Sequence, residues 1–187
     1  NRGGGIYASK ADYIEITNSS FSDNRAVEYG GGASVESVHR LFIARVSFRM
    51  NHATHEGGGL FVAEFDLQTS PKTSVMVFYC NFEANIANKA GMTLALIHSK
   101  MCYLQYIKIS IVVTKTSSVL SVQSKSLNFR NISIDNIFRA ISLTHTLIAT
   151  RAYYHNLMVQ CPRLTYLNEK VLLTKATKNI NIVHKCA

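Results

Sequence analysis

The chain has 187 residues, of which 47% are hydrophobic, and carries a formal net charge of +9. This length suits one domain with a sizeable core. No run of 18 or more apolar residues occurs, so the sequence contains no candidate membrane-spanning helix.

The charge is unevenly placed. Residues 1–97 have a net charge of −1, and residues 98–187 have a net charge of +10. The basic half suits an acidic partner such as a sulfated or carboxylated glycan, anionic lipid or an acidic protein, or it is an ordinary solvated surface. No pattern typical of a recognition helix is present, so nucleic acid is not an expected partner.

Glycine triplets recur from the start of the chain. They begin 27 residues apart and comprise Gly3, Gly4, Gly5, Gly30, Gly31, Gly32, Gly57, Gly58 and Gly59. A fixed period of this length indicates a repeat protein whose units stack on one another. Glycine at one place in successive units predicts a corner with positive φ, or a close approach between the backbones of adjacent layers.

A second motif, Phe-x-x-Asn, lies between the triplets, and an alanine follows each Phe by five residues. Its copies contain Phe21 and Asn24, Phe48 and Asn51, and Phe82 and Asn85. Asparagine tolerates the left-handed region of a turn, and its amide can bond to the next asparagine of a stack. The motif therefore predicts an asparagine ladder.

Two apolar segments follow in each repeat. The first segments are residues 6–8, 33–35, 60–62, 93–95, 119–121, 141–143 and 165–167. The second segments have apolar residues at spacings of 2, 3 and 2, most clearly at Leu41, Ile43, Val46 and Phe48. The same spacing recurs at 14–21, 75–82, 102–109 and 127–134, more loosely at 147–154, and uncertainly near Leu172.

Such a unit cannot bury its own apolar face, but it can do so against an identical neighbour. We therefore expect an all-β parallel β-helix of about seven coils in one domain, residues 1–187, well formed over 1–92 and degenerate over 93–187. The alternative is a β-sandwich of hairpins, which does not require one motif at a fixed interval. Because the chain opens inside a repeat, it is expected to be a piece of a longer protein.

The paired motifs resemble the polymorphic outer membrane protein repeats, in which GG[A/G/L/I] alternates with FxxN. The resemblance rests on Gly30 to Ala33 with Phe21 to Asn24, on Gly57 to Leu60 with Phe48 to Asn51, and on Phe82 to Asn85. It covers about residues 1–92. It implies a right-handed parallel β-helix, an extracellular or cell-surface location and, more weakly, an adhesin role.

The four cysteines form two pairs, each separated by about one coil. Cys80 and Cys102, and Cys161 and Cys186, are candidate disulfides, while the first two also suit small buried core positions. Two sequons begin at Asn18 and Asn131, as many as chance supplies, and therefore decide nothing.

Parallel β-helices include polysaccharide lyases and hydrolases, which need clustered carboxylates. Here Glu36 and Glu64 follow equivalent glycines, with Glu28 and His39 nearby. Exposed charges that aid solubility explain them better, and His52, His55 and Glu56 are taken as a chance cluster in a turn. We therefore expect no catalytic residue, metal site or cofactor, and keep a glycan-processing or glycan-binding protein as the alternative.

The middle residues of the first segments form a column that faces away from its neighbours. We predict an outward interaction ladder there, made of Tyr7, Phe61, Leu94, Leu120 and Tyr166. A loop or another domain could instead cover this face. The expected function is a non-catalytic structural or adhesin-type rod that presents a surface to other subunits or to the rest of its own chain.

Overall fold

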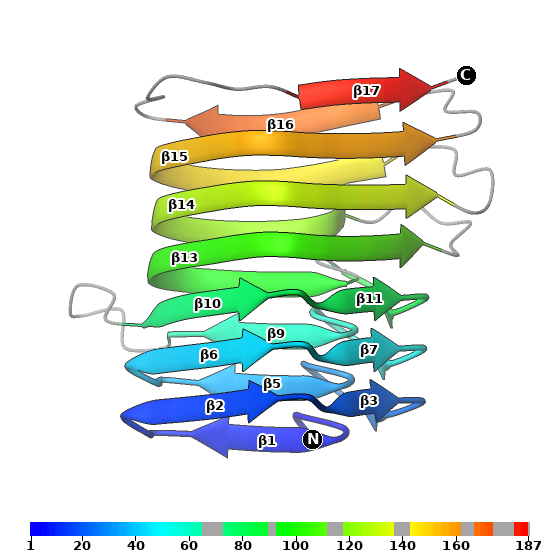
Figure 1. The fold of residues 1–187 in the computed structure, drawn as a ribbon. Helices are drawn as coiled ribbons and strands as arrows, with labels where there is room; N and C mark the ends of the chain where they lie inside the picture. Colours follow the sequence, from blue (N-terminus) through cyan, green and yellow to red (C-terminus); the bar gives the residue numbers. More distant parts are fainter. Residues whose placement is uncertain are drawn as a thin grey trace.

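In the computed structural model, the backbone is described at residues 1–64, 73–89, 93–111, 118–136, 143–161, 167–173 and 182–186. Side chains are described in these ranges up to residue 134, except at 98, 111, 118 and 119. These residues contain 17 strands and no helix, and every described pairing between strands is parallel. The expected fold, a right-handed parallel β-helix, is confirmed, and the hairpin sandwich is wrong. Figure 1 shows the coils stacked along one axis, with the two rows of strands running in opposite directions.

Each of the first three coils consists of four short strands. They are β1 (Ile6–Ser9), β2 (Tyr13–Thr17), β3 (Ser20–Ser22) and β4 (Arg25–Ala26); β5 (Ala33–Glu36), β6 (Arg40–Ala44), β7 (Ser47–Arg49) and β8 (His52–Ala53); and β9 (Leu60–Ala63), β10 (Ser74–Phe78), β11 (Asn81–Glu83) and β12 (Ile86–Ala87).

Later coils have longer strands. They are β13 (Leu94–Ile111), β14 (Ser118–Asn136), β15 (Leu143–Cys161), β16 (Leu167–Leu173) and β17 (Ile182–Cys186). Strand β13 pairs with β9 through its first part and with β10 and β11 through its later parts, so one strand continues around several sides of a coil. The number of coils differs slightly from the seven expected.

The 2-3-2 spacing of the second segments has a backbone cause. One residue in each coil at this corner has positive φ: Asn18, Arg45, Tyr79, Tyr106 and Asn131, with φ between 47° and 54°. A left-handed residue interrupts the alternation of a strand, so an extra residue separates two inward side chains. The register aligns the template residues of the first five coils as expected, whereas the sixth copy is Ala152, Tyr154, Leu157 and Val159 rather than 147–154.

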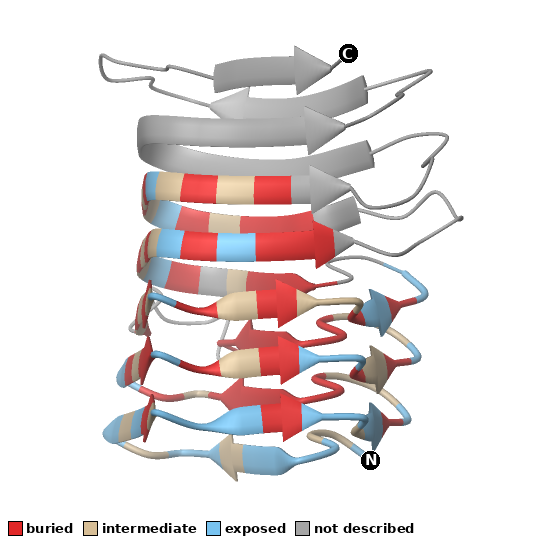
Figure 2. Ribbon diagram, turned by 45° about the vertical axis from the view of Figure 1, so that its right-hand side comes forward, coloured by how far each residue is buried: buried red, intermediate tan, exposed pale blue. Residues whose placement is uncertain are grey.

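The core is the inside of the coil. Buried aliphatic residues and the rings of the Phe-x-x-Asn motif fill it, and Phe48 stacks between Phe21 and Phe82 at centroid distances of 5.1 and 4.8 Å. Figure 2 shows buried residues alternating with more exposed ones along β7 and β10, whereas β5 and β9 are buried throughout. Because each ring packs on the ring one coil away, the period of the sequence is also the period of the packing.

Both reasons expected for the glycine triplets are present. Gly30 has a φ of +65°, in the left-handed region that favours glycine. Gly31 has no such φ, but a Cβ there would lie 2.3 Å from the carbonyl oxygen of Gly58 on the next coil. The first glycine of the triplet turns the chain, and the following ones allow two coils to approach closely.

The asparagine ladder is also confirmed. Asn51 is fully buried, and its amide donates to the carbonyl oxygen of Phe21 and to Oδ1 of Asn85, at 2.9 Å each. Its own Oδ1 accepts from the backbone N–H and the side-chain amide of Asn24, at 3.1 Å each. The side chain thus satisfies two backbone groups of the first coil, the carbonyl of Phe21 and the N–H of Asn24, and the side chain of Asn85 on the third, in a region closed to water.

The first cysteine pair is not a disulfide. Cys80 and Cys102 are free and buried, and they occupy different columns, since Cys102 pairs with Val75 and Leu127. Burial raises the pKa of the Cys80 thiol to about 11 and also raises that of Cys102. Cys161 and Cys186 are register partners on β15 and β17, so a disulfide between them stays a prediction.

Replacing Asn51 by alanine should destabilise the fold by about 2–5 kcal/mol, because buried groups on both neighbouring coils lose their partners. The matched change Asn24→Ala should cost about 0.5–1.5 kcal/mol, since it removes only one side-chain donation and leaves the acceptor on Asn51. Urea unfolding measures both. Equal losses at the two positions would contradict the ladder.

Candidate functional site

The predicted apolar ladder is wrong at Leu94 and Leu120, which point into the core, and Phe61 faces outward as predicted but is buried. Leu94 pairs with Leu60 and with Leu120, and this column is the core, where Leu94 is 0% and Leu120 is 2% exposed. The expectation was out of register by one residue after the third coil. Its cause is visible at Thr93, whose carbonyl accepts from both Gly59 and Leu60 and which therefore takes the place of a third glycine.

The column that faces outward is Tyr7, Ser34, Phe61, Ala95 and Ser121. Tyr7 is exposed, but Ser34 and Phe61 are buried, so the protein itself covers this face over the second and third coils. Part of the cover is Tyr29, whose ring stacks on Phe61 at a centroid distance of 4.5 Å. The interpretation that something covers this face is the correct one, and Tyr166 lies outside the described residues.

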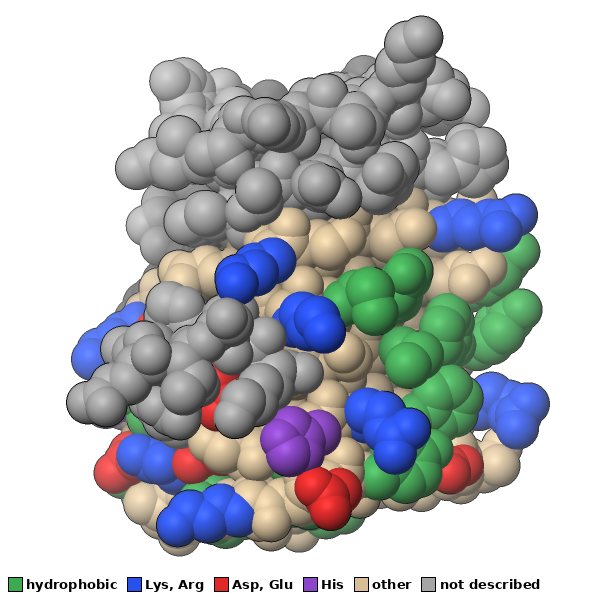
Figure 3. Space-filling view, turned by 90° about the vertical axis from the view of Figure 1, so that its left-hand side faces the viewer, with side chains coloured by type: hydrophobic (Ala, Val, Ile, Leu, Met, Phe, Trp, Pro, Cys, Tyr) green, Lys and Arg blue, Asp and Glu red, His purple; other side chains and the backbone are tan. Residues whose placement is uncertain are grey.

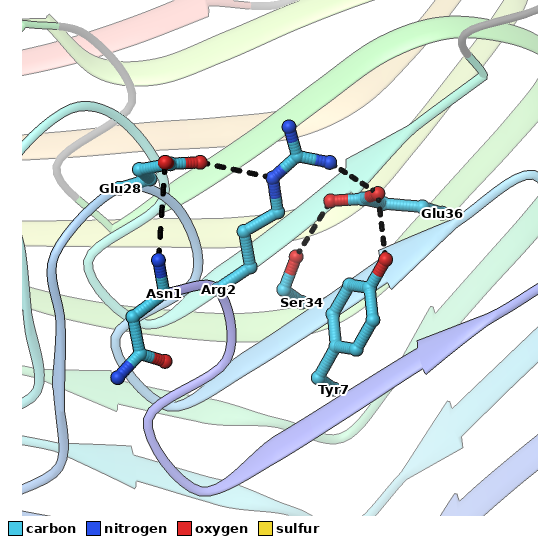
Figure 4. A network of polar contacts seen from close by, with 6 residues as sticks. All are labelled: Asn1, Arg2, Tyr7, Glu28, Ser34 and Glu36. Atoms are coloured by element: carbon cyan, nitrogen blue, oxygen red, sulfur yellow. Dashed lines mark hydrogen bonds and ion pairs between the residues drawn. The ribbon is translucent and has the colours of Figure 1, made fainter.

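A polar network lies on the same face near the first corner. The buried carboxylate of Glu36 accepts from Arg2 at 2.7 Å, from the Tyr7 hydroxyl at 3.1 Å and from the Ser34 hydroxyl at 3.4 Å. Arg2 also donates through Nε to Glu28 at 3.0 Å. Figure 4 shows the guanidinium between the two carboxylates. A buried carboxylate with these donors and an adjacent cation is stabilised as a structural ion pair.

The charges around this corner have different environments. The hydrogen bond from Arg2 is the main cause that lowers the pKa of Glu28. Loss of hydration raises the pKa of Glu56, and the positive charges of Lys89 and His55 offset part of this rise. The backbone N–H of His55 donates to the carbonyl oxygen of Glu28, and the backbone N–H of Lys89 donates to that of His55. These three residues therefore form one column on successive coils.

The carboxylates considered for catalysis do not form a facing pair. Glu36 pairs in register with Ala63 rather than Glu64, and Glu64 accepts from the Thr73 hydroxyl at 2.9 Å. His39 lies 2.9 Å from Asp12 at the surface, away from both. Within the part of the chain that the structure describes, no group of three or more His, Cys, Asp or Glu side chains could hold a metal ion.

A different surface carries exposed apolar side chains. It is the outer surface of the β2, β6, β10 and β13 sheet, and we call its apolar part the aromatic patch, made of Phe42, Met76, Phe78, Met101, Tyr103, Tyr79 and Tyr106. Tyr79 is 60% and Tyr106 39% exposed, and the other members are partly exposed. Figure 3 shows hydrophobic side chains gathered on the right of the view, where this sheet lies, with Lys and Arg beside them.

The patch has polar boundaries. In the first coil its columns contain Glu15 and Thr17 beside the exposed Tyr13, and in the fifth they contain Ser126, Asn128 and Arg130. The adjacent side of the coil, formed by β3, β7 and β11, provides an internal comparison. Its outward positions are mostly polar: Ser20, Ser22, Ser47, Arg49, Asn81 and Glu83. Two sides of one coil therefore differ in chemistry, and only one resembles an interface with an apolar centre and a polar rim.

The rings of the patch pack on one another. Tyr79 and Tyr106 stack at a centroid distance of 4.7 Å and an interplanar angle of 6°, and Phe42 lies 5.8 Å from Phe78. The faces of the two stacked tyrosines are therefore turned toward each other, along the axis of the stack. The surface they present consists of ring edges and hydroxyl groups.

Sequence reasoning missed this patch although a signal was present. The residues between the inward template positions are apolar at Phe42, Met76, Phe78 and Tyr103, where a solvated strand has polar residues. The predicted ladder comprises only residues of the first segments, and their predicted alignment is one residue out of register after the third coil.

Comparison with protein-family models, with curated proteins and with solved structures finds no match to this chain. Within the described residues, no helix is long and apolar enough to span a membrane.

If the Arg2 network is structural, Glu36→Gln should destabilise the fold by about 1–3 kcal/mol, since a bond to a charged partner is lost in a buried place. The control Glu83→Gln alters a surface pair with Arg49 at 3.9 Å and should cost about 0–1 kcal/mol. Urea unfolding of both variants is the measurement. Unchanged stability of the Glu36 variant would remove the structural explanation.

Proposed function

We propose that this chain is a non-catalytic structural segment of a large secreted or cell-surface protein, and that its aromatic patch binds another protein. The observation that carries the proposal is the contrast between the patch and the polar side formed by β3, β7 and β11. Exposed apolar groups framed by polar residues are typical of protein-binding surfaces.

The fold supports this role because it holds the patch on strands rather than loops. Within each column of the patch, the side chains repeat at the spacing of parallel strands, about 4.8 Å. Inward neighbours such as Leu41, Val75 and Leu104 are buried and fix each strand from the other side. Little side-chain or backbone ordering is then needed on binding, which lowers the cost of association.

A glycan-binding or glycan-processing role is the alternative. Sugars commonly stack on open ring faces, whereas Tyr79 and Tyr106 stack face to face with each other. Processing enzymes need two carboxylates across a cleft, and Glu36 is instead held by Arg2, Tyr7 and Ser34. A contact between acidic glycans and the basic residues after position 97 rests on composition alone.

The location at a cell surface and the adhesin role rest on the resemblance of the glycine and Phe-x-x-Asn motifs to surface-protein repeats. The resemblance covers residues 1–92 and includes the ladders that stabilise the fold. The proposed binding surface is a separate feature, since its residues lie outside both motifs.

Photocrosslinking tests the proposal in the cells that produce the protein. A photoreactive residue in place of Phe78 should give discrete crosslinked protein species, because this position lies in the patch. The same residue in place of Ser47, on the polar side, should give none. Absence of a crosslink from Phe78, or equal crosslinking from both positions, would refute a protein-binding patch.

A further inference from the structure

The rim of the aromatic patch has opposite charges at its two ends. The first coil contributes Asp12 and Glu15, both exposed. The fifth coil contributes Lys125 and Arg130, which are also exposed. The same polarity runs through the whole chain, since the net charge is −1 up to residue 97 and +10 beyond it.

We infer that the occupant of the aromatic patch is a second copy of this chain, bound face to face with its axis antiparallel. This inference rests on the proposed protein-binding function and names the partner. A two-fold axis gives each copy the same surface, so the surface must be complementary to itself. A patch with an apolar centre and opposite charges at its ends meets this condition when one copy is inverted.

The strand register specifies which residues would meet. Met76 is central, in the third coil and the middle outward column. A two-fold axis that passes Met76 parallel to the strands exchanges the first coil with the fifth and the second with the fourth, and each column then faces itself. Phe42 then faces Tyr103 of the second copy. Both belong to the same column as Met76, and the apolar centres of the two patches coincide.

The same operation brings the charged ends together. Lys125 in the fifth coil faces Asp12 in the first coil, since these residues directly precede Ser126 and Tyr13, which share one column. Arg130 faces Thr17, which lies two residues after Glu15 on the same strand. Lys100 in the fourth coil faces His39 in the second, and Arg45 in the second coil faces Tyr106 in the fourth, whose ring can accept a cation.

The observations favour a second copy over a different acidic protein. An acidic partner would use Lys125 and Arg130 but would meet like charges at Asp12 and Glu15. Inverted pairing uses both ends. Five coils at about 4.8 Å and five residues at about 3.3 Å give a sheet face of roughly 24 by 17 Å, which is small for a stable dimer. We therefore expect weak association, with a dissociation constant in the micromolar range.

Sedimentation equilibrium of the full-length protein at low salt tests this pairing. We expect a monomer–dimer equilibrium across the micromolar range, abolished by Met76→Lys because two ammonium groups would meet at the axis. The control Glu83→Lys, on the polar side, should leave it unchanged. Circular dichroism and the melting temperature establish that each variant is folded.

The decisive arm is a charge exchange. Asp12→Lys and Lys125→Asp should each weaken the dimer by about 5- to 30-fold, because two equivalent contacts change in one dimer. The double variant should recover most of the loss, since the charges are opposite again. A monomer at all concentrations, a dimer that tolerates Met76→Lys, or a double variant that fails to recover would overturn the inference.

Crosslinking separates failure of this inference from failure of the proposed function. A crosslink from Phe78 to a different protein, with a monomer in sedimentation, would keep a protein-binding patch and exclude the second copy. No crosslink and no dimer would remove both.

Discussion

The structure depends on one backbone constraint, a residue with positive φ at the same corner of successive coils. At the corner after β2, β6 and β10 the constraint falls on Asn18, Arg45 and Tyr79, and the same place in β13 and β14 is held by Tyr106 and Asn131. Only two of these five are asparagine, the residue that tolerates this region best after glycine, so stacking rather than local preference maintains the conformation. Each such corner resets which side chains face inward, and stacking then repeats that choice through the coils.

Because the corner divides the outer surface into separate sides, the sides can differ in chemistry. Beyond the corner the outward residues are mostly polar, and before it they form the aromatic patch. The face of β5 and β9 is a third case, since Glu36 and Phe61 point outward and are nevertheless buried under Arg2 and Tyr29. One repeated coil therefore supplies a solvated side, a covered side and an exposed apolar side, and only the last has the features of a binding surface.

The repeat could be predicted from sequence because its causes are local and recurrent. Glycine where a Cβ would meet the next coil, Phe48 between two other rings and Asn51 between two other amides all leave a trace at a fixed interval. The 2-3-2 spacing also located the inward residues of five second segments. At each of these positions a single physical requirement selects the residue type, and the requirement is the same in every coil.

The outward column of the first segments and the aromatic patch depend on contacts between coils, which the sequence of a single repeat does not reveal. Thr93 replaces a glycine without resembling one, so the alignment was displaced by one residue, and Leu94 and Leu120 were placed outside instead of in the core. Burial of Phe61 requires Tyr29, a residue of a different coil corner. The polar network was not predicted either. Arg2 is 26 residues from Glu28 and 34 residues from Glu36 in the sequence, and only the folded corner brings these side chains into contact.

The central claim is the register of the stack, and nuclear magnetic resonance of the labelled protein measures it most directly. Nuclear Overhauser effects between backbone protons should pair Phe61 with Ala95 and Met76 with Tyr103. This result would place Leu94 and Leu120 in the core and the aromatic patch on the surface. Contacts that pair Phe61 with Leu94 would contradict the account, because a shift of one residue exchanges the inner and outer side chains of the coil.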